Sequence, residues 1–420
     1  MIISKKKILL FIAVLAIFIG SVYLYRTYMD YGKDVAKEDN NTNSSEGTEE
    51  YKLKEDIKVH NDSNKEENNV EKDIDNILSN MTLEEKVGQL FIVTLEDINS
   101  GLDALYFNDN MKDSIDKYNI GGVIFFQKNI QDRSQVQDLI SNIQSSSKIP
   151  LFISVDEEGG VVSRIGNTPA MNTTKFEDML QVGNSKNYDR AYEIGNTIGR
   201  EIHELGFNLD FAPVADILTN PENTEIGTRS FGSDPEVVSN MVIKYAEGLQ
   251  DSNVSATLKH FPGHGDTLED SHMGSSYTLK TLDEVRKVEF LPFKAGIEKG
   301  IDFVLVSHLS APNITGSNVP ASLSPTIIKD ILRDELNYKN IVITDALNMG
   351  AVSFNYYPGE AAIESLKAGV DILLMTPNFE DVYNQVIVAV KEEVIPEERV
   401  DESVRRILRV KLNRNILNVD

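Results

Sequence analysis

The chain has 420 residues, 41% of them hydrophobic, a formal net charge of −25 and no cysteine. This length accommodates one large domain or two ordinary ones, and the hydrophobic content is that of a globular protein. The acidic surplus argues against a nucleic-acid partner, which requires a basic surface to replace phosphate counterions. The lack of cysteine excludes a disulfide framework, a cysteine zinc site, a thiol nucleophile and a lipid-modified cysteine.

The N-terminus has the pattern of a membrane anchor. Three lysines, Lys5 to Lys7, precede an uncharged run from Ile8 to Tyr25, and Arg26 ends that run. A run of this length is near the minimum that spans a bilayer core of roughly 30 Å. We therefore expect a transmembrane signal-anchor over residues 1–28, with the lysines in the cytoplasm and the remaining chain outside the cell membrane. A cleaved secretory signal is the alternative, and it also predicts export.

Residues 29–73 consist mostly of Asn, Glu, Lys, Asp and Ser. Such a segment buries too little apolar surface to offset its chain entropy, so we expect a disordered acidic linker. Helical spacing begins near Ile74, and Thr82 with Glu85 three residues later forms the pattern of a capping box. These features place one folded domain over residues 74–420.

Within that domain, short apolar runs alternate with longer amphipathic stretches. Buried parallel strands read as continuous apolar runs, and helices connect them. Eight such units predict an α/β protein that is a single (β/α)8 TIM-type barrel, with a doubly wound open sheet as the alternative. The runs cover residues 90–93, 122–126, 151–155, 209–214, 255–258, 303–306, 341–344 and 371–375.

Polar and ionisable residues follow several of these runs directly. In a barrel of this kind the C-terminal ends of the strands meet at one face, where the active site forms. We therefore expect the following groups to lie close together: Asp156, Asp216, Lys259 with His260, Ser307 with His308, and Asp345.

A histidine-rich loop follows the fifth run. It contains His260, His264 and His272, with Asp266 and Asp270 among them. Histidine beside carboxylates is typical of general acid–base catalysis, of a metal site, or of a structural polar loop. The residue types alone leave these three interpretations open.

Two further positions draw attention. Asp345 ends a strongly apolar strand, where an ionised carboxylate is costly unless a cation or ligand lies nearby. Asp156 and Arg164 bracket a Glu-Glu-Gly-Gly turn, and carboxylate and guanidinium groups together can hold sugar hydroxyls. The alternatives for Asp345 are a helix N-cap or a salt bridge to the barrel wall, and the alternative for Asp156 and Arg164 is a surface ion pair.

The same segments resemble glycoside hydrolase family 3, in its β-N-acetylhexosaminidase branch. The resemblance extends from about residue 74 to the C-terminus and keeps the family's order of motifs. In one position it departs from relatives, which often have Arg where this chain has Val161. The segments that carry the resemblance are residues 81–90, 156–160, 229–232, 259–267, 270–272 and 344–349.

This resemblance implies a role for each candidate residue. Asp345 matches the nucleophile that forms a covalent glycosyl intermediate, and His272 matches the acid/base, with Asp270 as its partner. The residues that match positions holding the N-acetylglucosamine ring are Asp156, Arg164, Arg229, Lys259 and His260. Neither a metal ion nor a cofactor is implied.

The function expected from these roles is retaining exo-hydrolysis of terminal β-linked N-acetylglucosamine from cell-wall (peptidoglycan) fragments. The expected partners are a carbohydrate substrate and the membrane, and the protein is expected to be a monomer. Three alternatives remain: a phosphorylase with phosphate as acceptor, a metallohydrolase using His260, His264 and His272, and a non-catalytic wall-binding protein.

Overall fold

The computed structural model describes residues 69–267, 274 and 276–419. The predicted anchor over residues 1–28 lies outside this range, as does the linker up to residue 68. No helix in the described part of the chain is long and apolar enough to cross a membrane. The first described helix, residues 69–79, begins before the expected boundary at residue 74. It does so because Glu71 pairs with Arg405 and Arg409 of the last helix, at 3.4 Å and 2.5 Å.

In the described part of the chain, eight parallel strands form one sheet in the order β10-β1-β2-β3-β6-β7-β8-β9. The sheet closes on itself where Ile343 pairs with Ile372 and the Thr344 amide donates to the Ile372 carbonyl at 3.0 Å. This closure confirms the predicted barrel over an open sheet. The strands are β1 (Phe91–Thr94), β2 (Gly122–Phe125), β3 (Phe152–Val155), β6 (Leu209–Asp210), β7 (Ser255–Phe261), β8 (Phe303–Val306), β9 (Ile341–Thr344) and β10 (Leu373–Leu374).

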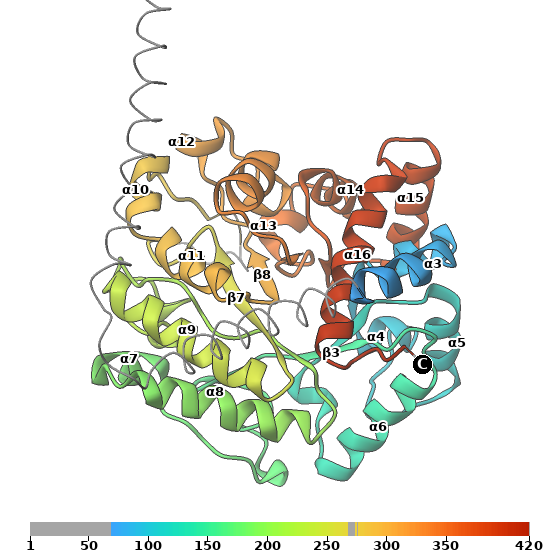
Figure 1. Cartoon of the computed structure of the whole chain (residues 1–420), viewed down its shortest axis with the longest axis horizontal. Helices are drawn as coiled ribbons and strands as arrows, with labels where there is room; N and C mark the ends of the chain where they lie inside the picture. The colour runs from blue at the N-terminus through green and yellow to red at the C-terminus, as the bar shows by residue number, and fades with distance from the viewer. Residues whose placement is uncertain (1–68, 268–273, 275, 420) are drawn as a thin grey trace, which may run out of the picture. The chain divides into compact units, whose positions relative to one another are not determined.

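Helices surround these strands, with α8, α9 and α11 side by side on one flank (Figure 1). Thr82 and Glu85 form the predicted capping box at the start of the first named helix. The helices are α3 (Leu83–Gly88), α4 (Leu95–Ile98), α5 (Asp109–Tyr118), α6 (Arg133–Ser145), α7 (Met179–Ser185), α8 (Tyr188–His203), α9 (Pro235–Asp251), α10 (Leu282–Lys287), α11 (Phe290–Glu298), α12 (Pro312–Thr315), α13 (Gly350–Ser353), α14 (Pro358–Ala368), α15 (Phe379–Lys391) and α16 (Glu397–Asn413), with the shorter or tighter turns η2 (Gln127–Asn129), η3 (Pro169–Met171), η4 (Gly227–Arg229) and η5 (Ala321–Leu323) and the π-helix η6 (Thr326–Glu335).

One strand is shorter than the sequence predicts. The apolar run over residues 209–214 forms β6 only at Leu209–Asp210, and the chain returns to the sheet at Val214, which pairs with Lys259. Pro213 lies between them and has no N–H to donate to a neighbouring strand, so the ladder is interrupted there. The interruption leaves the following residues free to turn toward the mouth of the barrel.

A hairpin of β4 (Glu157–Gly159) and β5 (Val162–Ser163) follows β3. Its turn needs glycine, because Gly159 and Gly160 have φ angles of 82° and 58°. The buried Glu157 carboxylate fixes the hairpin by accepting the amides of Ile165 at 2.7 Å and Gly166 at 3.0 Å. The hairpin therefore presents its other side chains to the barrel mouth from a rigid support.

The opposite end of the barrel contains a buried lysine. Lys411 Nζ donates to Gln89 Oε1 at 2.8 Å and to the Gly121 carbonyl at 3.2 Å, and it lies 4.9 Å from the Phe152 ring centroid. These partners precede or begin the first strands, on the side away from the strand ends that carry the polar residues. Burial lowers the pKa of Lys411 to about 7.

We expect Lys411→Met to flatten the pH dependence of stability above neutral pH. Between about pH 7 and the usual lysine range the unfolded chain binds a proton that the folded chain does not, so wild-type stability rises with pH. The slope approaches about 1.4 kcal/mol per pH unit and disappears below the folded pKa. Urea unfolding from pH 6 to pH 10 measures it. An equal slope in both proteins would show that Lys411 keeps its ordinary pKa.

Candidate active site

A cavity of about 330 Å³, here called the central pocket, opens at the C-terminal ends of the barrel strands. It brings together all six of the predicted site residues that the structure describes. Asp270 and His272, the predicted acid/base pair, lie outside the described residues. The six residues in the cavity wall are Asp156, Arg164, Arg229, Lys259, His260 and Asp345.

Asp345 follows β9 at the floor of this central pocket. Its amide donates to the Val306 carbonyl at 2.9 Å, which continues the sheet, and its Oδ1 accepts the Ala346 amide at 2.8 Å. Burial raises the pKa of the carboxyl group, but His260, His308 and Lys259, together with the hydrogen bond from the Ala346 amide, outweigh burial and leave that pKa below its usual value. Asp345 is therefore ionised at neutral pH.

His308, at the end of β8, supports the loop that carries Asp345. Its Nε2 lies 2.9 Å from the Ala346 carbonyl and must donate, because a carbonyl only accepts. Its Nδ1 lies 2.7 Å from the Ser322 hydroxyl in η5. Ala346 is thus held through its carbonyl by His308, while its amide donates to the Asp345 carboxylate.

An ionic network forms one wall of the same cavity. Arg229 donates two hydrogen bonds to Glu158, at 2.9 Å and 2.8 Å. Lys259 Nζ lies 2.6 Å from Glu158 and 2.9 Å from Asp156, and Arg164 lies 3.8 Å from Asp156. Two carboxylates and three cations therefore share one wall, with both donors and acceptors available to a polar ligand.

The charges in this network stabilise one another against burial. Burial raises the pKa of Glu158, but Arg229 and Lys259 lower it to about 2. Burial lowers the pKa of Lys259, but Asp156 and Glu158 outweigh that effect and raise it. Both groups stay charged across the physiological range. Glu158 was not among the predicted site residues, although it stands directly before Gly159 and Gly160 in the sequence.

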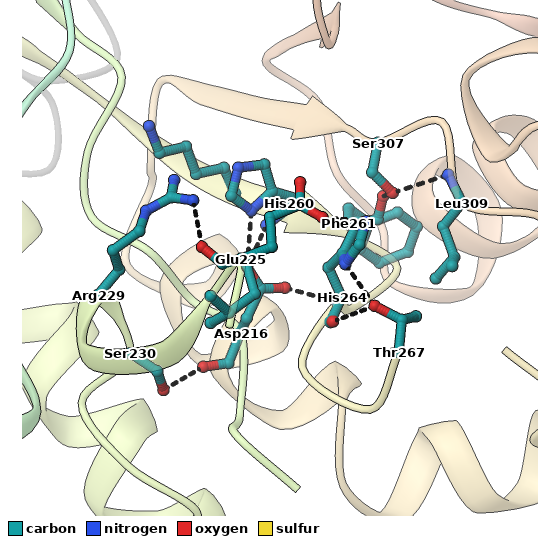
Figure 2. Close-up of polar contacts among 12 residues, drawn as sticks. Asp216, Glu225, Arg229, Ser230, His260, Phe261, His264, Thr267, Ser307 and Leu309 are labelled. Carbon is teal, nitrogen blue, oxygen red and sulfur yellow. Dashed lines mark hydrogen bonds and ion pairs between the residues drawn. The ribbon is translucent and has the colours of Figure 1, made fainter. Parts of the chain in front are cut away.

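Asp216 holds the start of the histidine loop (Figure 2). Its Oδ2 lies 2.7 Å from His260 Nδ1, and its Oδ1 accepts the His264 amide at 2.6 Å. Burial raises the pKa of Asp216, but His260 and His264 outweigh it and leave the pKa lowered. One buried carboxylate therefore orients the His260 ring toward the pocket and fixes the turn after β7.

His264 and Asp266 shape the loop. His264 Nδ1 lies 2.8 Å from the Thr267 hydroxyl, and the His264 carbonyl accepts the Asn223 side-chain amide at 2.8 Å. Asp266 accepts the Thr278 hydroxyl at 2.7 Å. Among the described residues, no group of three or more His, Asp or Glu side chains is arranged to hold a metal ion.

Residues 82–410 match the model of the glycosyl hydrolase family 3 N-terminal domain. The chain belongs to glycosyl hydrolase family 3. The match confirms the family that the order of the sequence motifs indicates. The matched residues include all six pocket residues named above.

Individual family 3 relatives support the same assignment. The β-hexosaminidase LpqI of Mycobacterium tuberculosis is 33% identical over 336 residues, which are 78% of this chain and 82% of the relative. The β-hexosaminidase A of Pseudoalteromonas piscicida is 34% identical over 329 residues, 72% of this chain and 54% of the relative. A family 3 β-N-acetylglucosaminidase structure from Paenibacillus sp. str. FPU-7 superposes with a TM-score of 0.75 at 36% identity, covering 80% of this chain.

This family 3 chain spans only part of some relatives. It covers 54% of the Pseudoalteromonas protein and 63% of the Paenibacillus chain. Residues 82–410, which the family model matches, contain the eight barrel strands and the six pocket residues. The pocket combines the ionised Asp345 carboxylate with charged side chains that can donate and accept hydrogen bonds, around a space large enough for one sugar ring.

Proposed function

We propose that the protein is a retaining exo-β-N-acetylglucosaminidase that removes terminal β-linked N-acetylglucosamine from cell-wall fragments. The observation that carries the proposal is the meeting of the ionised Asp345 with five sugar-holding candidates in one cavity. The names of the relatives, β-hexosaminidase and β-N-acetylglucosaminidase, support the choice of sugar.

In the first step the Asp345 carboxylate attacks the anomeric carbon. A bond forms between a carboxylate oxygen and that carbon, while the bond to the leaving oxygen breaks and this oxygen takes a proton. By resemblance the proton comes from His272, oriented by Asp270. The lowered pKa of Asp345 suits this role, because a protonated carboxyl group is a poor nucleophile.

In the second step water replaces the carboxylate. The imidazole that gave up its proton accepts one from water, whose oxygen bonds to the anomeric carbon as the ester to Asp345 breaks. Two displacements at one carbon give net retention of the β configuration. Histidine suits this double use, because its ordinary pKa lies near neutral pH.

The ionic wall holds the sugar during both steps. Lys259 and Arg229 donate to hydroxyl or carbonyl oxygens of the ring, and Asp156 accepts from hydroxyl groups. These groups are fixed by one another before substrate arrives, since Glu158 ties both cations in place. Such preorganisation spares the cost of ordering the side chains during the reaction.

Product analysis tests the proposed reaction. The enzyme should release p-nitrophenol from the β-N-acetylglucosaminide faster than from the matching β-glucoside, and early NMR spectra should show the β anomer of the free sugar. Early α anomer would contradict the covalent route, and faster β-glucoside cleavage would contradict the sugar specificity. A sugar 1-phosphate formed only when phosphate is present would indicate the phosphorylase. Loss of activity in EDTA that zinc restores would indicate the metallohydrolase.

His308 acts in this proposal as a positioning residue. We expect His308→Ala to lower kcat by about 10- to 100-fold with little change in KM, since misplacing a reacting group by 1 Å costs about that much. His308→Gln, which can still donate to Ala346, should recover part of the loss. Loss of His308 should also move the acidic limb of kcat/KM to higher pH, because His308 lowers the pKa of Asp345. If the acidic limb of kcat/KM stays in place, and kcat falls together with thermal stability, the role of His308 is purely structural.

The proposed setting is the outer face of the cell membrane, with residues 1–28 as a retained anchor and the barrel as a monomer. Fractionation of cells expressing the full chain tests the location. Activity in the membrane fraction, accessible to added protease in intact cells, supports it. Activity only in the medium would indicate a cleaved signal, and sedimentation of the purified chain as a dimer would exclude the monomer.

A further inference from the structure

A buried carboxyl group that the proposed mechanism does not use lies close to the ionic wall of the central pocket. Asp210 ends β6, its side chain is fully buried, and it is not among the residues that line the pocket. Its neighbours across the sheet are Val155 of β3 and Ala256 of β7. Val155 directly precedes Asp156, so Asp210 sits beside the strand end that presents the ionic wall.

The two oxygens of Asp210 have unequal surroundings. Oδ1 accepts the amide of Glu157, the first residue of the hairpin β4–β5, at 2.9 Å. Oδ2 is buried and has no hydrogen-bond partner among the described residues. A buried carboxylate needs several donors to replace the water that it loses, whereas a neutral carboxyl group needs less compensation. A single donor on a buried group therefore favours the neutral form.

Glu157 shows the opposite arrangement, although it is buried as well. Its carboxylate accepts the Ser163 hydroxyl and the amides of Ile165 and Gly166. Donors of this kind favour the charged form of a carboxyl group, and a charged neighbour disfavours a second ionisation. The hydrogen bonds therefore place the negative charge on Glu157 and the proton on Asp210.

Among the described residues, the titratable groups that face Asp210 come from three segments. Glu157 and Asp156 follow β3, Lys259 belongs to β7, and Tyr245 belongs to α9. Burial raises the pKa of Asp210 well above its usual value, and the two carboxylates add to this effect. The Glu157 amide and Lys259 act against it and are outweighed. Tyr245 contributes no charge at neutral pH, because burial raises its own pKa.

We propose that Asp210 is a positioning residue that acts in its protonated form and thereby keeps the sugar-holding wall in place. This inference rests on the proposed function, because it takes that wall as the site of the N-acetylglucosamine ring. An ionised Asp210 would repel Asp156 and compete with it for Lys259. The neutral form leaves the 2.9 Å contact between Lys259 and Asp156 undisturbed, and it still accepts the Glu157 amide that begins the hairpin.

Asp210→Asn tests the protonation state, because the amide has the shape of the neutral acid and does not ionise. With a raised folded pKa, the folded wild-type chain binds a proton that the unfolded chain has lost above the usual value of 3.8, so wild-type stability falls as the pH rises. Urea midpoints should therefore shift in favour of Asp210→Asn between about pH 4 and pH 7. A fixed packing difference adds the same amount at every pH and does not produce this trend.

Glu158→Gln is the matched control, since it makes the same acid-to-amide change in the ionic wall. The pKa of Glu158 is lowered to about 2, so raising the pH should favour wild type over Glu158→Gln, which is the opposite trend. If the midpoint difference between Asp210→Asn and wild type is flat, or follows the trend of Glu158→Gln, then Asp210 is ionised and the inference is overturned.

Calorimetric titration with N-acetylglucosamine tests the positioning role without involving the acid/base chemistry. At pH 7, Asp210→Asn should bind the sugar as tightly as wild type, because it keeps the acceptor for the Glu157 amide. Asp210→Ala lacks that acceptor and should bind about tenfold more weakly, the loss expected when a buried amide loses its partner. Equal weakening in the Asn and Ala variants would contradict the neutral form. Wild-type binding in both variants would exclude the positioning role.

The two measurements separate this inference from the proposed function. If wild type neither binds N-acetylglucosamine nor hydrolyses its p-nitrophenyl β-glycoside, the proposed function fails. The urea midpoints still decide the protonation state of Asp210 in that case. If wild type does both, the pH trend of Asp210→Asn and its sugar affinity decide the inference by themselves. Asp210→Asn also keeps the test valid if Asp210→Ala does not fold.

Discussion

Replacing Asp345 by alanine is expected to lower kcat for the p-nitrophenyl substrate roughly 10⁴-fold or more, the scale seen when a nucleophile is removed. The carboxylate is placed at the pocket floor by the Val306 carbonyl and the Ala346 amide, and no other carboxylate among the described residues occupies the end of β9. Stopped and continuous assays measure the loss. Circular dichroism establishes that the variant is folded.

Azide tests whether the loss is chemical. The space left by the Asp345 side chain admits an external nucleophile, which attacks the anomeric carbon directly and expels p-nitrophenolate. Azide should therefore restore turnover of Asp345→Ala and give the α-glycosyl azide, since one displacement inverts the configuration. As a matched control, Asp283→Ala removes a carboxylate from α10 that is outside the pocket wall and should retain wild-type kcat. Rescue that gave a β product would contradict the assignment.

The second large effect is expected at Glu158, which is only 2% exposed and contacts two cations. Glu158→Gln keeps the shape but leaves Arg229 without its ionic partner and Lys259 with Asp156 alone. Breaking a buried ion pair from one side costs about 3–5 kcal/mol. We therefore expect a loss of that size in the free energy of unfolding, measured by urea denaturation at pH 7, together with a higher KM.

Glu177 provides the matched control for Glu158. It also receives two hydrogen bonds from one arginine, Arg190, at 3.2 Å and 3.0 Å, but both side chains are about one-third exposed. Exposed pairs contribute about 1 kcal/mol or less, so Glu177→Gln should change stability little. Equal losses in the two variants would show that burial does not set the strength of the Glu158 network.

Lowering the pH should narrow the difference in unfolding free energy between wild type and Glu158→Gln. The folded pKa of Glu158 is about 2, below the usual 4.5, so its stabilising charge is present above pH 4.5 and is lost as the pH falls toward 2. The gap in unfolding free energy should therefore be largest near neutral pH and smaller at pH 3. If the difference in unfolding free energy between the two proteins grew as the pH fell, the pKa of Glu158 would not be lowered in the folded state.

Much of the barrel follows from the sequence. Runs such as residues 303–306 and 341–344 became strands with the predicted bounds, because a strand covered on both faces must be apolar throughout. The run over residues 209–214 formed a strand only at Leu209–Asp210. Its apolar pattern predicts a longer strand, but Pro213 has no N–H to donate to a neighbouring strand. Local pattern predicts burial well but does not show which backbone groups find partners.

The sequence by itself selected candidate site residues: strand-end position and motif order pointed to Asp345, Lys259 and His260. Only the tertiary structure decided how they are held. Glu158 and Asp216 act through contacts with residues 71 and 44 positions away, and sequence spacing contains no information on such distances.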